Sequence, residues 1–74
     1  MNSLERDCKL LKESRRAVVI VATQCTKGHV ILWCNKSGYT VSSVKYSPLR
    51  YSTGGVLKFS EAVTEYKNRV DEVI

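Results

Sequence analysis

The stretch Ala17–Tyr46, AVVIVATQCTKGHVILWCNKSGYTVSSVKY, decides the fold of this chain. It contains three runs that are rich in β-branched and aromatic residues, a composition typical of strands. The predicted strands are Ala17–Cys25, Val30–Cys34 and Tyr39–Tyr46. Short turns built around Gly28 and Gly38 separate them, and turns of this length join antiparallel neighbours. The middle of the chain is therefore predicted to be a β-meander.

A helix is predicted on each side of the meander, because apolar residues recur at helical spacing in both flanking segments. The first helix should run from about Ser3 to Arg15, with Ser3 as its N-cap. Its apolar stripe consists of Leu4, Cys8 and Leu11. The last helix is expected to be capped by Ser60, with Phe59 just ahead of the cap. Its stripe consists of Val63, Tyr66, Val70 and Val73.

The segment between the third strand and the last helix is predicted to be a loop. Ser47-Pro48 should end the strand, because proline cannot donate to a β-ladder, and the loop should extend to Gly55. Val56–Phe59 can add a short edge strand. Residues 1–74 are thus predicted to form one α+β domain of order α-β-β-β-α. Its antiparallel sheet has three or four strands, and both helices lie on one face.

The length and composition of the chain favour a small globular protein outside the membrane. A chain of 74 residues has a thin core. The longest apolar run, Ala17–Ala22, is far shorter than the roughly 20 residues of a membrane span. The N-terminal residues are polar and include acids, so no signal peptide is expected and the predicted location is cytoplasmic. The odd number of cysteines, Cys8, Cys25 and Cys34, favours reduced thiols.

Basic residues are concentrated in the middle of the chain. The segment 14–60 carries seven of them and no acid, within a chain of net charge +5. Five aromatic residues lie in the same segment: Trp33, Tyr39, Tyr46, Tyr51 and Phe59. Basic and aromatic side chains together are typical of binding surfaces for nucleic acids and for proteins. The segment therefore predicts a positive binding surface on the sheet side.

Catalytic and metal-binding patterns are weak. His29 has no acid within fifteen residues on either side, so an acid can reach it only through the tertiary structure. The chain lacks a nucleophile elbow, a phosphate-binding loop and a His-Glu-x-x-His pair. Cys8, Cys25, His29 and Cys34 offer a Cys₃His set for zinc, but every cysteine pair is nine or more residues apart. We therefore expect no enzyme, no cofactor and no metal, although the sequence leaves zinc open.

Two family resemblances bear on these predictions. The order helix, β-meander, helix is that of double-stranded RNA-binding domains, yet Lys27-Gly28-His29 replaces their Gly-Pro-x-His loop and Glu61 lies where a lysine is expected. More locally, Ile31–Thr40 followed by Arg50-Tyr51-Ser52 and a terminal helix resembles small bacteriophage-encoded proteins of unknown role. It departs from their pattern in having Leu49-Arg50 before the aromatic. That resemblance implies a protein that binds and blocks one host factor in the host cytoplasm.

We therefore predict a small basic non-enzymatic binding protein that docks on an acidic surface of a host protein. The expected contact residues are Arg15, Arg16, Lys27, Trp33, Lys36, Tyr39, Lys45, Arg50 and Tyr51. The alternative is that the same residues bind nucleic acid, which the acids of the last helix disfavour. A second copy of the chain is a further candidate partner, because a thin core and a free strand edge favour dimers.

Overall fold

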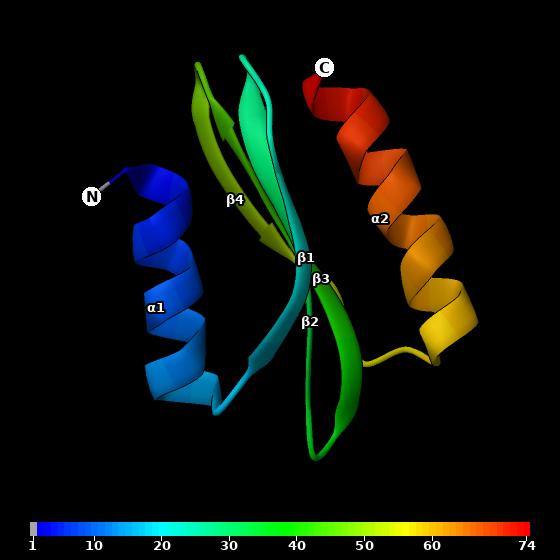
Figure 1. Ribbon diagram of the computed structural model, residues 1–74. Helices are drawn as coiled ribbons and strands as arrows, with labels where there is room; N and C mark the ends of the chain where they lie inside the picture. The colour runs from blue at the N-terminus through cyan, green and yellow to red at the C-terminus, as the bar shows by residue number, and fades with distance from the viewer. Residues whose placement is uncertain (1) are drawn as a thin grey trace.

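An antiparallel sheet forms the centre of the structure, a computed structural model that describes residues 2–74 (Figure 1). Its strands lie in chain order, so each strand pairs with its neighbour in the sequence. The elements are α1 Ser3–Arg15, β1 Val18–Gln24, β2 Gly28–Asn35, β3 Gly38–Tyr46, β4 Leu49–Thr53 and α2 Phe59–Val73. The predicted α+β class and antiparallel meander are confirmed, and the sheet has four strands.

Strand β2 is the most deeply buried element, because every residue from Gly28 to Trp33 is buried. Successive side chains of a strand point to opposite faces of its sheet. Ile31 and Trp33 accordingly pack in one apolar cluster, and Val30 and Leu32 pack in another. Both faces of β2 are therefore apolar, and other elements must shield each of them from water.

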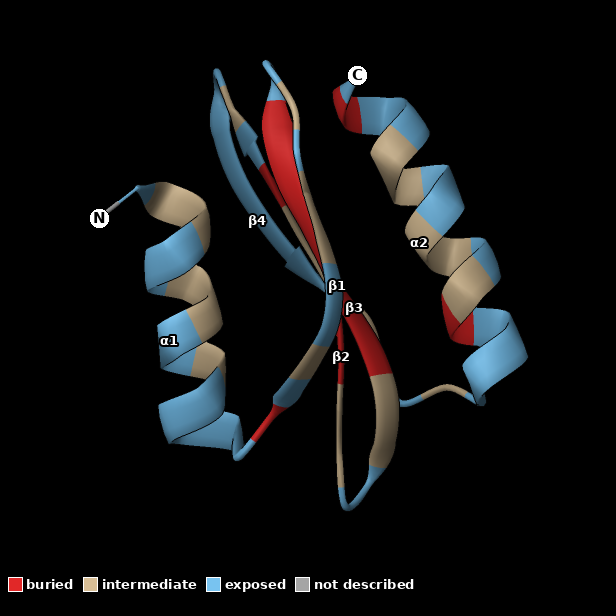
Figure 2. Ribbon diagram, in the orientation of Figure 1, coloured by how far each residue is buried: buried red, intermediate tan, exposed pale blue. Residues whose placement is uncertain are grey.

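The two helices shield these faces from opposite sides of the sheet (Figure 1). Helix α1 packs its Leu4–Cys8–Leu11 stripe against Ile31 and Trp33. Helix α2 packs Ala62 and Val73 against the other cluster. Figure 2 shows the buried segments of the strands lying between the two helices. The prediction that both helices share one face is wrong, since one layer of helices would leave an apolar face of β2 in water.

The segment predicted to be a loop contains strand β4. Proline at position 48 ends β3, but it lies in the two-residue turn between Tyr46 and Leu49, which are partners across the β3–β4 pair. The Ser47–Pro48 peptide in this turn is cis. The missing N–H of a proline matters only within a ladder, so the chain can reverse and pair again. The edge strand expected at Val56–Phe59 is reduced to a single bridge between Leu57 and Tyr39.

The N-cap of each helix lies one or two residues before the predicted cap. Asn2 caps α1, because its side-chain oxygen accepts the Glu5 N–H at 2.8 Å. At α2 the carboxylate of Glu61 accepts the N–H of Lys58 at 3.1 Å, so the helix starts at Phe59. These bonds satisfy backbone donors that the first turn of a helix leaves free. Within residues 2–74, neither helix is long and apolar enough to cross a membrane.

Candidate functional site

Strand β4 is the most exposed strand of the sheet, since all five of its residues are exposed (Figure 2). Helix α1 packs over β1 and β2, so it does not cover β4. Tyr51 pairs with Val44, which pairs with His29, so their side chains share the α1 side of the sheet. The Tyr51 side chain is 64% exposed there, and Leu49, two residues earlier on the same side, is 58% exposed. Two large apolar side chains therefore face solvent at one edge.

A cleft of about 140 Å³ lies between α1 and the β3–β4 hairpin. Its apolar lining includes Leu11, Ile31 and Val44, and its polar lining includes Ser14, Ser42 and Thr53. Leu10 and Tyr51 also line it, and both are more than half exposed. A dry cavity of roughly 150 Å³ holds one benzene-sized ring. The cleft thus has the volume and lining to accept one apolar side chain from a partner.

The imidazole of His29 lies at the inner wall of this cleft and is fully buried. Its Nε2 lies 2.8 Å from Oδ2 of Asp7 on α1, and its Nδ1 lies 2.7 Å from the hydroxyl of Tyr46 on β3. The side-chain amide of Gln24 donates to the same hydroxyl at 2.7 Å. One consistent order of protons has the Gln24 amide donating to Tyr46, Tyr46 donating to Nδ1, and Nε2–H donating to the Asp7 carboxylate.

Because both ring nitrogens of His29 have partners within the fold, the imidazole offers no free nitrogen to a substrate or metal. This network of side-chain hydrogen bonds instead links α1 to β1, β2 and β3. Sequence reasoning did not find Asp7 as the partner of His29. A signal was present, however, since Asp7 lies three residues after Leu4 and four before Leu11, on the apolar side of its helix.

The cysteines of the zinc hypothesis lie apart. Cys8 packs against the cluster on the α1 side of the sheet, whereas Cys25 packs against the cluster on the α2 side. Cys34 pairs with Val18 at the far end of β2 from His29. In the part of the chain that the structure describes, no three His, Cys, Asp or Glu side chains converge as metal ligands. Burial raises the pKa of the Cys8 thiol, with Lys12 opposing this and Asp7 adding to it.

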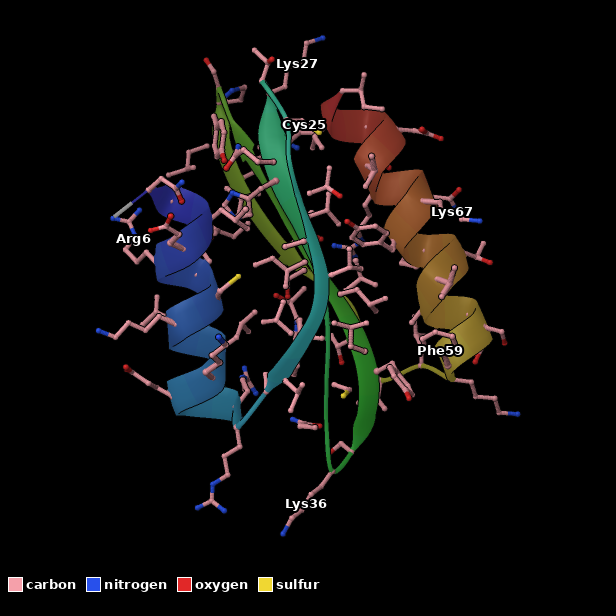
Figure 3. The ribbon with its side chains drawn as sticks, in the orientation of Figure 1. Arg6, Cys25, Lys27, Lys36, Phe59 and Lys67 are labelled. Carbon is pink, nitrogen blue, oxygen red and sulfur yellow. The ribbon has the colours of Figure 1, made fainter. Side chains whose placement is uncertain are left out.

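The predicted basic contact residues divide between the two ends of the sheet. One end has Lys45 paired with Gly28 and with Arg50, and the carbonyl of Lys27 there accepts the Tyr46 N–H at 3.0 Å. The other end has Arg15, Arg16 and Lys36, and the side chain of Asn35 donates to the Arg15 carbonyl at 3.1 Å. Figure 3 labels Lys27 and Lys36 at opposite ends. Strand β2 separates the groups by about 20–25 Å, so the structure does not form one continuous positive surface.

Acids of α2 lie beside the end that contains β4. Lys45 and Arg50 line a groove with Glu65, Glu72 and Arg69. Arg69 is held by Glu65 at 2.7 Å and by the Ser43 hydroxyl and the Ser52 carbonyl at 3.0 Å each. Lys45 and Arg50 are exposed, and together with Arg69 they give the groove three positive charges against the two glutamates. This end therefore keeps a small positive excess on the α2 side of the sheet, the face opposite to the cleft and Tyr51.

The three predicted aromatic anchors have different surroundings. Trp33 is 4% exposed, and its indole N–H donates to the Ser42 hydroxyl at 3.0 Å, so it belongs to the core. Tyr39 is half-buried and packs edge-on against Phe59, with ring centroids 5.1 Å apart. Tyr51 is exposed. Of these three side chains, Tyr51 is the one available to a partner.

The candidate site is therefore the edge strand β4 with the adjacent cleft. Tyr51 lies at the rim of the cleft on the α1 side of the sheet, and Lys45 and Arg50 lie along the same edge on the α2 side. The site combines an exposed aromatic, an apolar recess and a partial positive charge. Such a combination is typical of protein-binding surfaces. No protein-family model matches the chain, and no curated protein or solved structure shows significant similarity to it.

Proposed function

We propose that this chain is a non-enzymatic binding domain that docks on another protein through β4 and the cleft between α1 and the β3–β4 hairpin. The observation that carries the proposal is the position of Tyr51, which is 64% exposed at the rim of an apolar cleft on a strand at the edge of the sheet. Tyrosine supplies a large rigid contact area and dominates many protein interfaces. A core role does not account for a ring in this position.

The proposed binding mode combines strand addition with one inserted side chain. Edge strand β4 can pair its outer backbone groups with an extended segment of the partner, as in β-augmentation. An aliphatic or aromatic side chain of the partner then enters the cleft against Leu11 and Ile31. The hydroxyls of Ser42 and Thr53 provide polar contacts at its lining. Main-chain pairing supplies affinity, and the size of the cleft supplies selectivity.

The partner surface is expected to be acidic. Lys45 and Arg50 are exposed next to the edge, and Lys27 lies at the same end of the sheet. Rim charges of this kind raise the association rate and orient the encounter more than they tighten the final complex. The resemblance of Ile31–Thr40 to phage-encoded proteins makes a bacterial host protein the proposed partner. Binding would then inhibit or modulate that protein in the host cytoplasm.

Nucleic acid is the less favoured ligand. Single-strand binders combine a continuous basic groove with several exposed rings on one face. Here Trp33 is buried and Tyr39 is packed against Phe59. The basic residues are divided between the two ends of the sheet, and Glu65 and Glu72 lie beside Arg50. The described surface therefore lacks the continuity that phosphate tracking requires.

An affinity capture from nuclease-treated bacterial lysate tests the proposal. The wild type should retain a stoichiometric protein, Tyr51→Ala should lose it, and Lys67→Glu on the outer side of α2 should retain it. In a parallel shift assay, DNA or RNA binding should be weak at low salt and absent at physiological salt. Nucleic-acid binding that persists at physiological salt, or a captured protein that Tyr51→Ala still retains, would contradict the proposal.

A further inference from the structure

Strand β1 is the second edge of the sheet, and its α2 side is only partly covered. Helix α2 packs mainly on β2 and β3. Val18 and Val21 pair with Cys34 and Leu32, so they point to the α2 side, and the register shift places Ile20 in a bulge between Val19 and Val21. The exposed fractions are 63% for Val18 and 42% for both Ile20 and Val21. Three branched apolar side chains therefore lie exposed along this edge.

The flank of α2 that faces β1 is also apolar. The Tyr66 hydroxyl hydrogen-bonds to the Thr23 hydroxyl, which places this flank beside β1. Val63 and Val70, three residues before and four residues after Tyr66, lie on the same flank and are half-buried. The opposite flank carries Arg69, which bonds to the β3–β4 hairpin. The apolar flank and the exposed β1 residues together form an apolar strip, bordered on α2 by Lys67. We name it the β1 strip: Val18, Ile20, Val21, Val63 and Val70.

The two edges of the sheet differ in charge. Strand β1 has the sequence VVIVATQ, without a charged residue, whereas β4 contains Arg50 opposite Lys45 of β3. Natural proteins usually protect exposed strand edges with lysine, proline, other charges or β-bulges. Apart from the bulge at Ile20, β1 has none of these protections, so its uncharged apolar edge is a template for pairing with another strand.

We propose that β1 pairs antiparallel with β1 of a second copy of this chain, which joins two sheets into one sheet of eight strands. The distribution of charge favours a second copy of the chain as the partner at this edge. Each copy carries a net charge of +5, so two copies repel each other least when they meet at an uncharged surface. A β4-to-β4 contact would bring Arg50 and Lys45 of both copies together, whereas the paired β1 strands bring together neutral side chains and have Arg16 and Lys27 only at their ends.

The symmetry of the contact also fits the β1 strip. Antiparallel pairing of identical strands places the two-fold axis perpendicular to the sheet, so both α2 helices lie on the same side. Val63 and Val70 of each copy then border the groove above Val18 and Val21 of the joined β1 strands. The β1 strip of one copy therefore contacts the β1 strip of the other, as an isologous interface requires.

The size of the strip sets the expected affinity. Strand β1 and the two valines of α2 contribute about ten residues per copy, compared with roughly 20–30 per side in a standard interface. A contact of this size is at the low end of specific interfaces. We therefore expect a reversible dimer with a dissociation constant on the order of 10 µM, not an obligate one.

Sedimentation velocity of the purified full chain, from about 1 µM to about 500 µM, tests the dimer. The mass should rise from 8.4 kDa toward twice that value. Val18→Lys should shift the midpoint to at least tenfold higher concentration, because a lysine blunts a strand edge. Leu49→Lys introduces the same residue on the β4 edge, at a site of similar exposure, and should leave the midpoint unchanged.

Hydrogen exchange of the wild type at the two extremes of concentration provides a readout that needs no variant. Amides within Val18–Gln24 should gain protection at high concentration, and those within Leu49–Thr53 should not. If the wild type stays monomeric throughout the concentration series, the proposal is wrong and the partner of β1 is a different protein. Protection gained at β4 without protection at β1, or loss of the dimer in Leu49→Lys alone, overturns it as well.

Discussion

The buried imidazole of His29 and the carboxylate of Asp7, 2.8 Å apart, join helix α1 to the central strand of the sheet. Helix α1 otherwise rests on one stripe of three apolar side chains and has no fully buried residue of its own. The His29 ring is 0% exposed, so its Nε2–H depends on this one partner. The pair therefore sets the position of α1, and with it the width of the cleft beside β4.

We predict that Asp7→Ala destabilises the protein by about 1–3 kcal/mol, because it leaves a buried donor of His29 without a partner. Asp7→Asn should cost less, since its amide oxygen can still accept. Glu13→Ala removes an acid of the same helix that makes only an exposed pair with Lys9, at 4.0 Å, and should cost under about 0.5 kcal/mol. Urea unfolding followed by circular dichroism measures all three. Equal losses for Asp7→Ala and Glu13→Ala would show that the pair does not stabilise the fold.

We predict that Gly28→Ala is among the most destabilising single changes in the chain. A Cβ at this position would overlap the backbone carbonyl oxygen of Val44 and would lie 3.0 Å from a methyl group of Val73. Because the overlap is with backbone, β2 and β3 would have to separate, at a cost of more than about 3 kcal/mol. At Gly55 a Cβ would meet nothing within 4 Å. Gly55→Ala should therefore be neutral or slightly stabilising. Thermal unfolding followed by circular dichroism measures both variants, and similar melting temperatures for the two would contradict the prediction.

Local sequence patterns predicted the parts of the fold that depend on local interactions. Helix α1 has the predicted bounds, Ser3–Arg15, because its apolar stripe and its terminal charges agree. Strand β4 escaped prediction because Leu49–Thr53 is exposed throughout and is held by pairing with β3, so it has no buried alternation to detect. The position of the helices depends on which face of β2 each one covers, and β2 is apolar on both faces.

The candidate site was predicted only in part for the same reason. Arg50 and Tyr51 were identified from composition, and both are exposed on β4. Trp33 was predicted as a contact residue because two helices on one face would leave the other face of the sheet open. Once α1 covers that face, the ring becomes core. The partner of His29 lies twenty-two residues away in sequence. The spacing of Asp7 from Leu4 and Leu11 places this acid on the apolar side of its helix, but it does not identify His29 as the group that it contacts.

Arg16 provides a test of local strain. It ends α1 in the left-handed region, at φ 53°, while the N–H of Ala17 bonds to the Leu11 carbonyl at 3.2 Å. Glycine is the usual residue at this position because a side chain is disfavoured there. We predict that Arg16→Gly raises the free energy of unfolding by about 1 kcal/mol, whereas Arg15→Gly, within the helix, lowers it by a similar amount. Chemical denaturation of the two variants should give opposite signs, and a loss in both would exclude strain at Arg16.

The Cys8 thiol provides a test of burial. Because burial raises its pKa, the folded chain should keep this thiol protonated at pH values where the unfolded chain begins to ionise. The folded state then binds more protons, so stability should fall as the pH rises above the ordinary thiol range, and Cys8→Ala should remove that part of the slope. Site-resolved alkylation by iodoacetamide should also be slower at Cys8 in buffer than in urea. Equal rates in the two solvents would contradict the shift.

Charge reversal distinguishes the two basic ends of the sheet. Arg50→Glu and Lys36→Glu each change one exposed residue and lower the net charge by the same amount. If the partner docks at β4, Arg50→Glu should slow association severalfold, and added salt should reduce the difference from wild type, because rim charges act mainly on the encounter. Lys36→Glu, at the far turn, should change association by no more than its effect on net charge. Surface plasmon resonance with the captured partner measures both. Equal slowing by the two variants would mean that net charge, not the β4 edge, governs binding.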